Sequence, residues 1–169
     1  QVFGEMVNDG ATNQPRQLSE EFTQSVWDSV IDYAEQYNDP GVFTAFIGYE
    51  FSSLPDGGDN LHRVVIFRDG ADETRQVVPF SLFDGENPEE LWDYFARYEE
   101  KTGGQVFAIP HNGNLSAGRM FALEDLDGKP LTAAYAENRM RWEPLVETTQ
   151  MKGDSETHLA LSPDDEFAD

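Results

Sequence analysis

Two histidines and a glutamate stand where apolar runs of this sequence begin or end. The run Val106–Ile109 stops at a proline, and His111 follows at the start of a loop rich in glycine and asparagine. The run Val42–Tyr49 ends at Glu50, and His62 opens the next strand-like segment. Because the strands of an α/β sheet deliver their carboxyl ends to one edge, we expect these three side chains to converge there. Imidazole and carboxylate are ligands that Zn, Mn and Fe accept, so the sequence predicts a metal site.

Each of these residues also has a purely structural interpretation. A carboxylate such as Glu50 caps a loop or pairs with Arg63 when it binds no metal. His62 then hydrogen-bonds the backbone of its own loop, and His111 is held by the turn Asn112-Gly113-Asn114. We favour metal ligation by Glu50, His62 and His111, with Glu50 and His111 also acting in catalysis.

Polar residues in the loops are candidates for contacting a substrate. Asn112 and Asn114 either hold a ligand oxygen or simply tolerate left-handed backbone conformations. Lys152, one of only three lysines, follows an expected strand and can bind an anionic group as a point charge. Arg119 is a second candidate for meeting an anion. Solvent exposure is the competing interpretation of Lys152, and His158 is expected to be exposed.

The composition is strongly acidic, which excludes several classes of partner. The 169 residues carry 33 acidic and 11 basic side chains, a formal net charge of −22. Such a surface repels phosphate backbones and anionic lipids, so we expect no nucleic-acid and no membrane partner. No apolar stretch approaches the roughly 18 residues of a membrane span, so we expect a soluble protein. The chain has no cysteine, which excludes disulfides and thiolate sites and leaves the compartment, cytoplasmic or periplasmic, open.

Helix and strand signals alternate along the chain. Helices are expected at 20–37, 88–102 and 132–142, the first two capped by Ser19 and Asn87. Strands are expected at 42–49, 63–68, 76–78, 106–109 and 145–149. Because these strands read as buried on both faces, we predict one α/β domain over residues 1–169, in which helices flank a mostly parallel sheet. Residues 1–17 are expected to be irregular, and residues 160–169 to form an exposed tail.

The first helix has an apolar face that is expected to pack on the core. Residues at helical spacing define it, with a second set widening it: Phe22, Val26, Val30, Tyr33 and Tyr37, then Trp27, Ile31 and Ala34. Motifs of other enzyme classes are missing, because the sequence contains no Gly-x-Ser-x-Gly, no Gly-x-Gly-x-x-Gly, no P-loop and no His-Glu-x-x-His.

Five segments of the sequence resemble one family. They are Pro40-Gly41-Val42-Phe43-Thr44-Ala45-Phe46-Ile47-Gly48-Tyr49-Glu50, Asn60-Leu61-His62-Arg63, Ile109-Pro110-His111-Asn112-Gly113-Asn114-Leu115-Ser116, Glu143-Pro144-Leu145-Val146-Glu147 and Lys152-Gly153-Asp154-Ser155-Glu156. From about Pro40 onward the chain resembles a large family of uncharacterised, mostly bacterial proteins that is known as a domain of unknown function. That family is similar to the PHP superfamily, named for polymerase and histidinol phosphatase.

The resemblance implies a distorted (β/α)7 PHP-like barrel with two or three divalent metals at the carboxyl ends of its strands. In such enzymes the metals activate a water molecule that attacks a phosphoester. By the same resemblance, Glu50 corresponds to the bridging glutamate, His62 to the histidine that follows it, and His111 to the histidine that ends a later strand. The implied cofactor is Mn, Zn or Fe, and the implied substrate is a small molecule or another phosphoester.

Part of the superfamily pattern is missing from the sequence. The early His-x-His pair, the Asp and His that follow it, and the late Asp-x-His are all absent. We therefore expect a middle fragment of a longer enzyme, which binds metal weakly or not at all and is inactive alone. Apolar surface left by absent barrel strands favours a homo-oligomer. Two alternatives stay open: a non-catalytic binding or scaffold module with structural histidines, and a metal hydrolase of another bond, such as a sulfate ester or an amide.

Overall fold

The computed structural model describes residues 18–55, 58–154, 160 and 163. Its helices are α2 (Glu20–Tyr37), α3 (Ala71–Thr74), α4 (Pro88–Thr102) and α5 (Ala133–Trp142), and its main strands are β1 (Ile47–Phe51), β2 (His62–Phe67) and β3 (Val106–His111). Two 3-10 turns, η2 (Gly113–Leu115) and η3 (Arg119–Phe121), follow β3, and the short strands β4 (Thr149–Gln150) and β5 (Gly153–Asp154) follow α5. The expectations for residues 1–17, for His158 and for most of the 160–169 tail lie outside the described residues.

The predicted helices are confirmed, and two of them carry the predicted caps. The hydroxyl of Ser19 accepts a hydrogen bond from the backbone amide of Phe22 at 3.2 Å and so caps α2. Glu90 accepts from the backbone amide of Asn87 at 3.2 Å at the start of α4, and Gly103 ends that helix with a left-handed φ of 73°. These contacts satisfy backbone groups that helix ends leave unpaired. Among the helices described, none has the length and apolar character that crossing a membrane requires.

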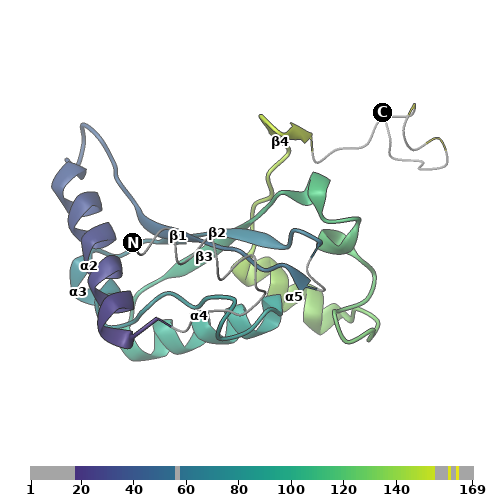
Figure 1. Cartoon of the computed structure of the whole chain (residues 1–169), viewed down its shortest axis with the longest axis horizontal. Helices are drawn as coiled ribbons and strands as arrows, with labels where there is room; N and C mark the ends of the chain where they lie inside the picture. The colour runs from purple at the N-terminus through teal and green to yellow at the C-terminus, as the bar shows by residue number, and fades with distance from the viewer. Residues whose placement is uncertain (1–17, 56–57, 155–159, 161–162, 164–169) are drawn as a thin grey trace.

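The three main strands form an antiparallel sheet in the order β1-β2-β3 (Figure 1). Tyr49 of β1 pairs with Val65 of β2, which pairs in turn with Ala108 of β3. The predicted mostly parallel sheet is therefore wrong, and so is the distorted (β/α)7 barrel that the resemblance implies. A parallel neighbour needs a long crossover, usually a helix, but the described residues between β1 and β2 contain no α-helix.

Three apolar segments that read as strands are wholly or partly irregular, and of residues 42–49 only 47–49 belong to β1. The backbone amides of Val42 and Phe43 donate to the carbonyl of Asp39 at 2.9 and 2.8 Å, so the predicted first strand starts as a turn. Val42 is 82% exposed rather than buried on both faces. The predicted strand at 76–78 is irregular chain after α3, and most of the predicted strand at 145–149 is irregular as well. A β-rich composition makes a strand only where a neighbouring strand pairs with it.

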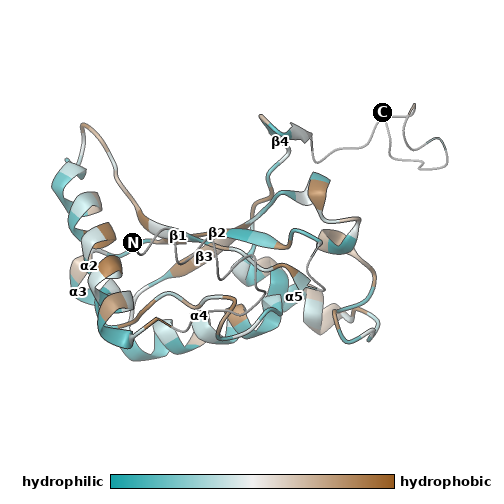
Figure 2. Ribbon diagram, viewed as in Figure 1, coloured by the Kyte–Doolittle hydropathy of each residue, from teal (hydrophilic) through white to brown (hydrophobic). Residues whose placement is uncertain are grey.

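Helices cover one face of the sheet, which we call the covered face. Helix α2 packs beside β1, and α4 and α5 pack against β3, below the sheet in Figure 1. The outer side of α4 is largely hydrophilic (Figure 2). Alternate strand residues and inward helix residues form the core, which includes Ile47, Phe51, Val65, Phe67, Ala108, Trp27, Ile31, Trp92, Phe95 and Tyr98.

The other face of the sheet, which we call the open face, carries the remaining strand residues. Those of β2 and β3 are half-buried: His62, Val64, Ile66, Phe107, Ile109 and His111. Glu50 of β1 belongs to this face and is exposed. The β4 segment rises on this side of the sheet in Figure 1. Because side chains alternate along a strand, each strand contributes both to the core and to this second surface.

Candidate functional site

Glu50, His62 and His111 meet on the open face of the sheet. His62 begins β2 and His111 ends β3, and the antiparallel register pairs the two residues directly. Glu50 lies opposite Val64, which is two residues along β2 from His62 and on the same face. The expected convergence is present, but it arises from antiparallel neighbours rather than from the shared carboxyl edge of parallel strands.

The carboxylate of Glu50 contacts both histidines. Its Oε1 lies 2.8 Å from His62 Nδ1 and 3.9 Å from His111 Nε2. The Glu50 side chain is 46% exposed, whereas those of His62 and His111 are 15% and 21% exposed. The carboxylate therefore lies closer to solvent than the two imidazole rings that it contacts. The alternative pairing of Glu50 with Arg63 is wrong, because Arg63 points to the covered face and its Nε donates to Glu143 Oε1 at 2.9 Å.

The hydrogen-bonding needs of His62 are not met. Its Nδ1 lies between Glu50 Oε1, which accepts, and Asn112 Nδ2, a donor 3.0 Å away. One ring nitrogen cannot donate and accept at the same time, so only one of these contacts is a hydrogen bond in either tautomer. The other nitrogen, Nε2, is buried without a hydrogen-bond partner among the described residues. A buried polar atom left unpaired costs about 1–3 kcal/mol.

Two residues that the sequence did not single out, Glu147 and Gln150, surround His111. Glu147 Oε1 lies 2.8 Å from His111 Nδ1, and Oε2 accepts from the Asn112 backbone amide at 3.0 Å and from Gln150 Nε2 at 3.1 Å. Burial alone raises the pKa of Glu147, but these hydrogen bonds outweigh burial and lower the pKa below its ordinary value. The sequence offered one reason to single out Glu147. It lies inside an expected core strand, where an unpaired carboxylate is costly.

Asn112 belongs to the same cluster and has the left-handed backbone that the sequence suggested (φ 63°, ψ 34°). It is 1% exposed, and its Oδ1 accepts from Gln150 Nε2 at 2.6 Å. Asn114 lies next to it along the chain and donates from Nδ2 to the backbone carbonyl of Lys152 at 3.2 Å. The Lys152 side chain is exposed. The structure therefore places Asn112 beside the histidines and joins Asn114 to Lys152 through a backbone contact.

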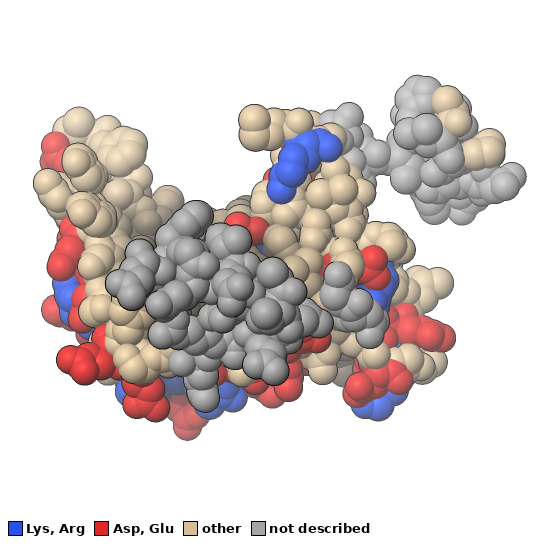
Figure 3. Space-filling view, viewed as in Figure 1, with Lys and Arg blue, Asp and Glu red and all other residues tan. Residues whose placement is uncertain are grey.

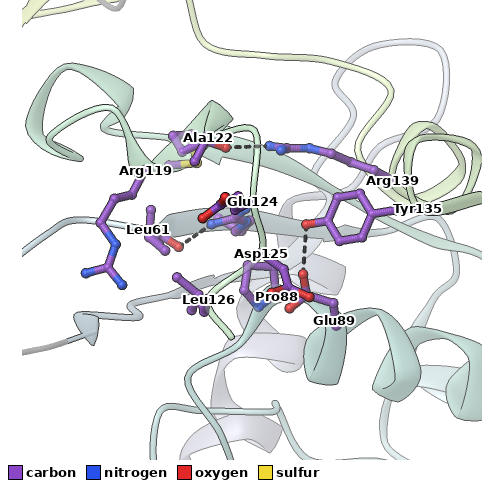
Figure 4. A pocket seen from close by; sticks show the side chains of 12 residues that line it. Leu61, Pro88, Glu89, Arg119, Ala122, Glu124, Asp125, Leu126, Tyr135 and Arg139 are labelled. Atoms are coloured by element: carbon purple, nitrogen blue, oxygen red, sulfur yellow. Dashed lines mark hydrogen bonds between the residues drawn. The ribbon is translucent and has the colours of Figure 1, made fainter. Parts of the chain in front are cut away.

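Arg119 borders a different hollow, formed partly by the covered face (Figure 4). Its Nη1 donates to Asp59 Oδ2 at 3.0 Å, and in Figure 4 its guanidinium points away from Tyr135 and Arg139. The cavity has a volume of about 20 Å³, which holds about one water molecule. This hollow is too small for a substrate, and the structure does not join Arg119 to the histidines through it.

The cluster has suitable donor types for a divalent metal, but the donors are not assembled around one point. Ligand atoms that lie about 2.1 Å from a metal lie roughly 3.0–3.4 Å from each other. The separations of 2.8 and 3.9 Å around Glu50 Oε1 fall on either side of that range. Within residues 18–55 and 58–154, no group of three or more His, Cys, Asp or Glu side chains is placed to hold a metal ion. Metal binding at this cluster therefore requires side-chain movement.

A family model matches nearly the whole chain. The family model with the description "Protein of unknown function (DUF3604)" matches residues 3–169. This match confirms the resemblance to a family of unknown function, because it spans nearly the whole sequence. The comparisons with curated proteins and with solved structures gave no match.

Proposed function

We propose that this chain, which belongs to the DUF3604 family, carries part of the active site of a metal-dependent hydrolase. In this proposal Glu50, His62 and His111 bind a divalent Mn, Zn or Fe ion, and Glu50 and His111 also contact the reacting atoms. The observation that carries the proposal is the meeting of one carboxylate and two imidazoles, from three neighbouring strands, on the open face. His62 adds a second reason, because one of its buried ring nitrogens lacks a partner among the described residues.

In this proposal the residues of the cluster have different roles. A bound divalent ion lowers the pKa of a coordinated water to about 7 and so provides hydroxide at neutral pH. Glu50 is exposed enough to face both an ion and an incoming substrate, while the two imidazoles are more buried and hold fixed positions. We propose that Asn114 and Lys152 contact an anionic substrate group; the side-chain amide of Asn114 donates to the backbone carbonyl of Lys152.

We propose a phosphoester as the substrate. Support comes from the similarity of the family motifs to the PHP superfamily, whose members cleave phosphoesters. The surface argues for a small phosphoester, because a net charge of −22 repels polyanions such as nucleic acids. In Figure 3 the acidic side chains lie mainly along the lower edge and the sides of the visible face, with basic ones among them. A sulfate ester or an amide uses the same metal-bound water, so both belong in the substrate panel.

A non-catalytic binding module is the second candidate. One observation favours it: each histidine already has a carboxylate at 2.8 Å, Glu50 for His62 and Glu147 for His111. Such pairs hold imidazoles in place without a metal. This candidate predicts that divalent ions bind no better at the cluster than at the rest of the acidic surface.

Metal titration separates the two candidates. We expect the wild-type chain to bind Zn²⁺ or Mn²⁺ with saturation in calorimetry, and Mn²⁺ to broaden the ring signals of His62 and His111 in NMR spectra. Glu50→Gln should weaken binding at least about tenfold, since altering even the partners of ligands costs 10–100-fold. Glu100→Gln, the same change at an exposed position of α4, should leave affinity within about twofold. Equal effects of the two substitutions, or broadening spread over the whole surface, would support the binding module.

Hydrolysis is the second readout, measured on the full-length protein with metal added. We expect about two or three metals per chain, on superfamily analogy, and cleavage of p-nitrophenyl phosphate that Glu50→Gln abolishes. The sulfate ester and a p-nitroanilide serve as competing substrates. A full-length protein that holds metal and cleaves only one of these would move the proposal to that bond. A metal-free, inactive protein would contradict it.

A further inference from the structure

We infer that Glu147 is a positioning residue: it fixes the orientation and the tautomer of His111, so that the Nε2 lone pair faces Glu50. Nothing in the sequence assigned a role to Glu147. The inference deepens the proposed function and rests on it for its consequence in metal binding, but the arrangement itself is a matter of hydrogen bonds between the described residues.

Glu147 contacts three consecutive residues at and just after the end of β3: Pro110, His111 and Asn112. Its backbone amide donates to the carbonyl of Pro110 at 3.3 Å. Its Oε1 lies 2.8 Å from His111 Nδ1, and its Oε2 accepts from the backbone amide of Asn112 at 3.0 Å. Because two of these contacts involve backbone atoms, the carboxylate is anchored independently of the ring that it holds.

The contacts of Glu147 determine which nitrogen of His111 carries the proton. An ionised carboxylate can only accept hydrogen bonds, so a ring nitrogen at 2.8 Å must donate. The proton of a neutral His111 ring therefore sits on Nδ1, and Nε2 keeps its lone pair. That Nε2 lies 3.9 Å from Glu50 Oε1, on the side of the ring where the proposed ion binds. Metal-binding histidines commonly have this arrangement, with the second nitrogen donating to a carboxylate.

Gln150 links Glu147 to Asn112, which in turn contacts His62. Its Nε2 donates to Glu147 Oε2 at 3.1 Å and to Asn112 Oδ1 at 2.6 Å. Since Oε2 cannot donate, the Gln150 amide must present its nitrogen here, and Asn112 must present its oxygen to Gln150. The Asn112 amide nitrogen is thereby directed at His62 Nδ1, 3.0 Å away. Both histidines of the cluster thus contact the hydrogen-bond network around Glu147.

The test reads the tautomer directly, by two-bond ¹H–¹⁵N NMR correlations of the histidine rings at neutral pH. We expect wild-type His111 to carry its proton on Nδ1. In Glu147→Gln the ring should lose this fixed state and show a mixture with the Nε2–H form. Gln150→Ala, which removes one donor to the carboxylate and leaves His111 untouched, should keep the wild-type tautomer. Zn²⁺ affinity should fall about 10–100-fold in Glu147→Gln and less in Gln150→Ala.

The outcomes separate this inference from the proposed function. If wild-type His111 carries its proton on Nε2, the inference is wrong whether or not the variants fold. If the tautomer of Glu147→Gln matches wild type, the inference is also wrong, even when metal binds at Glu50. A chain that binds no metal but shows the expected change of tautomer keeps Glu147 as a positioning residue and overturns the metal-dependent function instead.

Discussion

Two adjacent residues of β2 show how differently the faces of this sheet accommodate a polar side chain. Arg63 points to the covered face, is 1% exposed, and donates to Glu143 Oε1 at 2.9 Å and to the Leu61 carbonyl at 2.6 Å. His62 points to the open face, where an acceptor and a donor compete for one ring nitrogen and the other nitrogen lacks a partner among the described residues.

Glu143, the partner of Arg63, has further contacts with charged and polar groups. Glu143 Oε1 also accepts from Trp92 Nε1 at 3.0 Å, and Oε2 pairs with Arg139 Nε at 3.0 Å. The described residues therefore balance the charge of this buried carboxylate with two guanidinium groups, although its Oε2 makes an ion pair and no hydrogen bond among them. Under the helices, the charges of Arg63 and Glu143 are balanced by protein groups. On the open face, His62 has an acceptor and a donor competing for one ring nitrogen and no partner for the other among the described residues.

The largest expected effect comes from removing one charge on each face by the same substitution. Glu143→Gln leaves the buried guanidinium of Arg63 without its counter-charge and should lower the free energy of unfolding by about 3–5 kcal/mol. Glu50→Gln removes an exposed carboxylate and should cost less than about 1 kcal/mol. Urea unfolding followed by circular dichroism measures both. Similar losses for the two variants would mean that the faces do not differ in the way described.

A smaller loss of stability is expected when two adjacent valines, one on each face of the sheet, are shortened to alanine. Val65 is fully buried on the covered face, so Val65→Ala should cost about 2–3 kcal/mol, from lost burial plus the cavity that remains. Val64 lies on the open face and is only half-buried, so Val64→Ala should cost about 1 kcal/mol or less. The same unfolding experiment ranks the two variants, and the reverse order would place the main core on the wrong side of the sheet.

The sequence predicted the helices well and the direction of the strands poorly, for a common reason. Ser19, Asn87 and Gly103 act through local hydrogen bonds and backbone angles, which a sequence encodes directly. Strand direction depends on distant partners. Val64 and Ile66 are apolar although they lie on the open face, so β2 looks buried on both faces, which is the pattern of a parallel sheet.

Helical spacing likewise identified α2 without identifying its inner face. Trp27 and Ile31 are buried, but the set at three- and four-residue spacing is 37–65% exposed: Phe22, Val26, Val30, Tyr33 and Tyr37. The helix has two apolar stripes, and its own sequence does not say which one meets the sheet. The candidate site was likewise only partly predictable from the sequence. Glu50, His62 and His111 stood out by residue type and position. Glu147 and Gln150 join them through contacts between distant parts of the chain, with Glu147 bonded to the end of β3 and Gln150 to Asn112.

The smallest expected effect concerns alkaline pH and again separates the faces. Tyr98 of α4 is 1% exposed in the core, where its ring packs edge-on against Phe67 of β2, and its hydroxyl donates to Asp69 Oδ2 at 2.9 Å. Burial, and after it the hydrogen bond and charge of Asp69, raise the pKa of Tyr98 well above its ordinary value. A raised pKa contributes stability that is fully present below about pH 10, the unfolded value, and is lost as the pH rises toward the folded value.

Between pH 8 and pH 10.5 the wild-type chain should therefore lose about 1 kcal/mol of stability through this one group. Tyr98→Phe should lack that part of the loss, so its free energy of unfolding falls less steeply with pH, whatever its stability at pH 8. Tyr37→Phe is the control, because the ring of Tyr37 is 62% exposed on α2 and should leave the slope unchanged. Parallel slopes for Tyr98→Phe and wild type would show that the covered face does not keep the Tyr98 hydroxyl protonated, and would weaken the contrast between the two faces of the sheet.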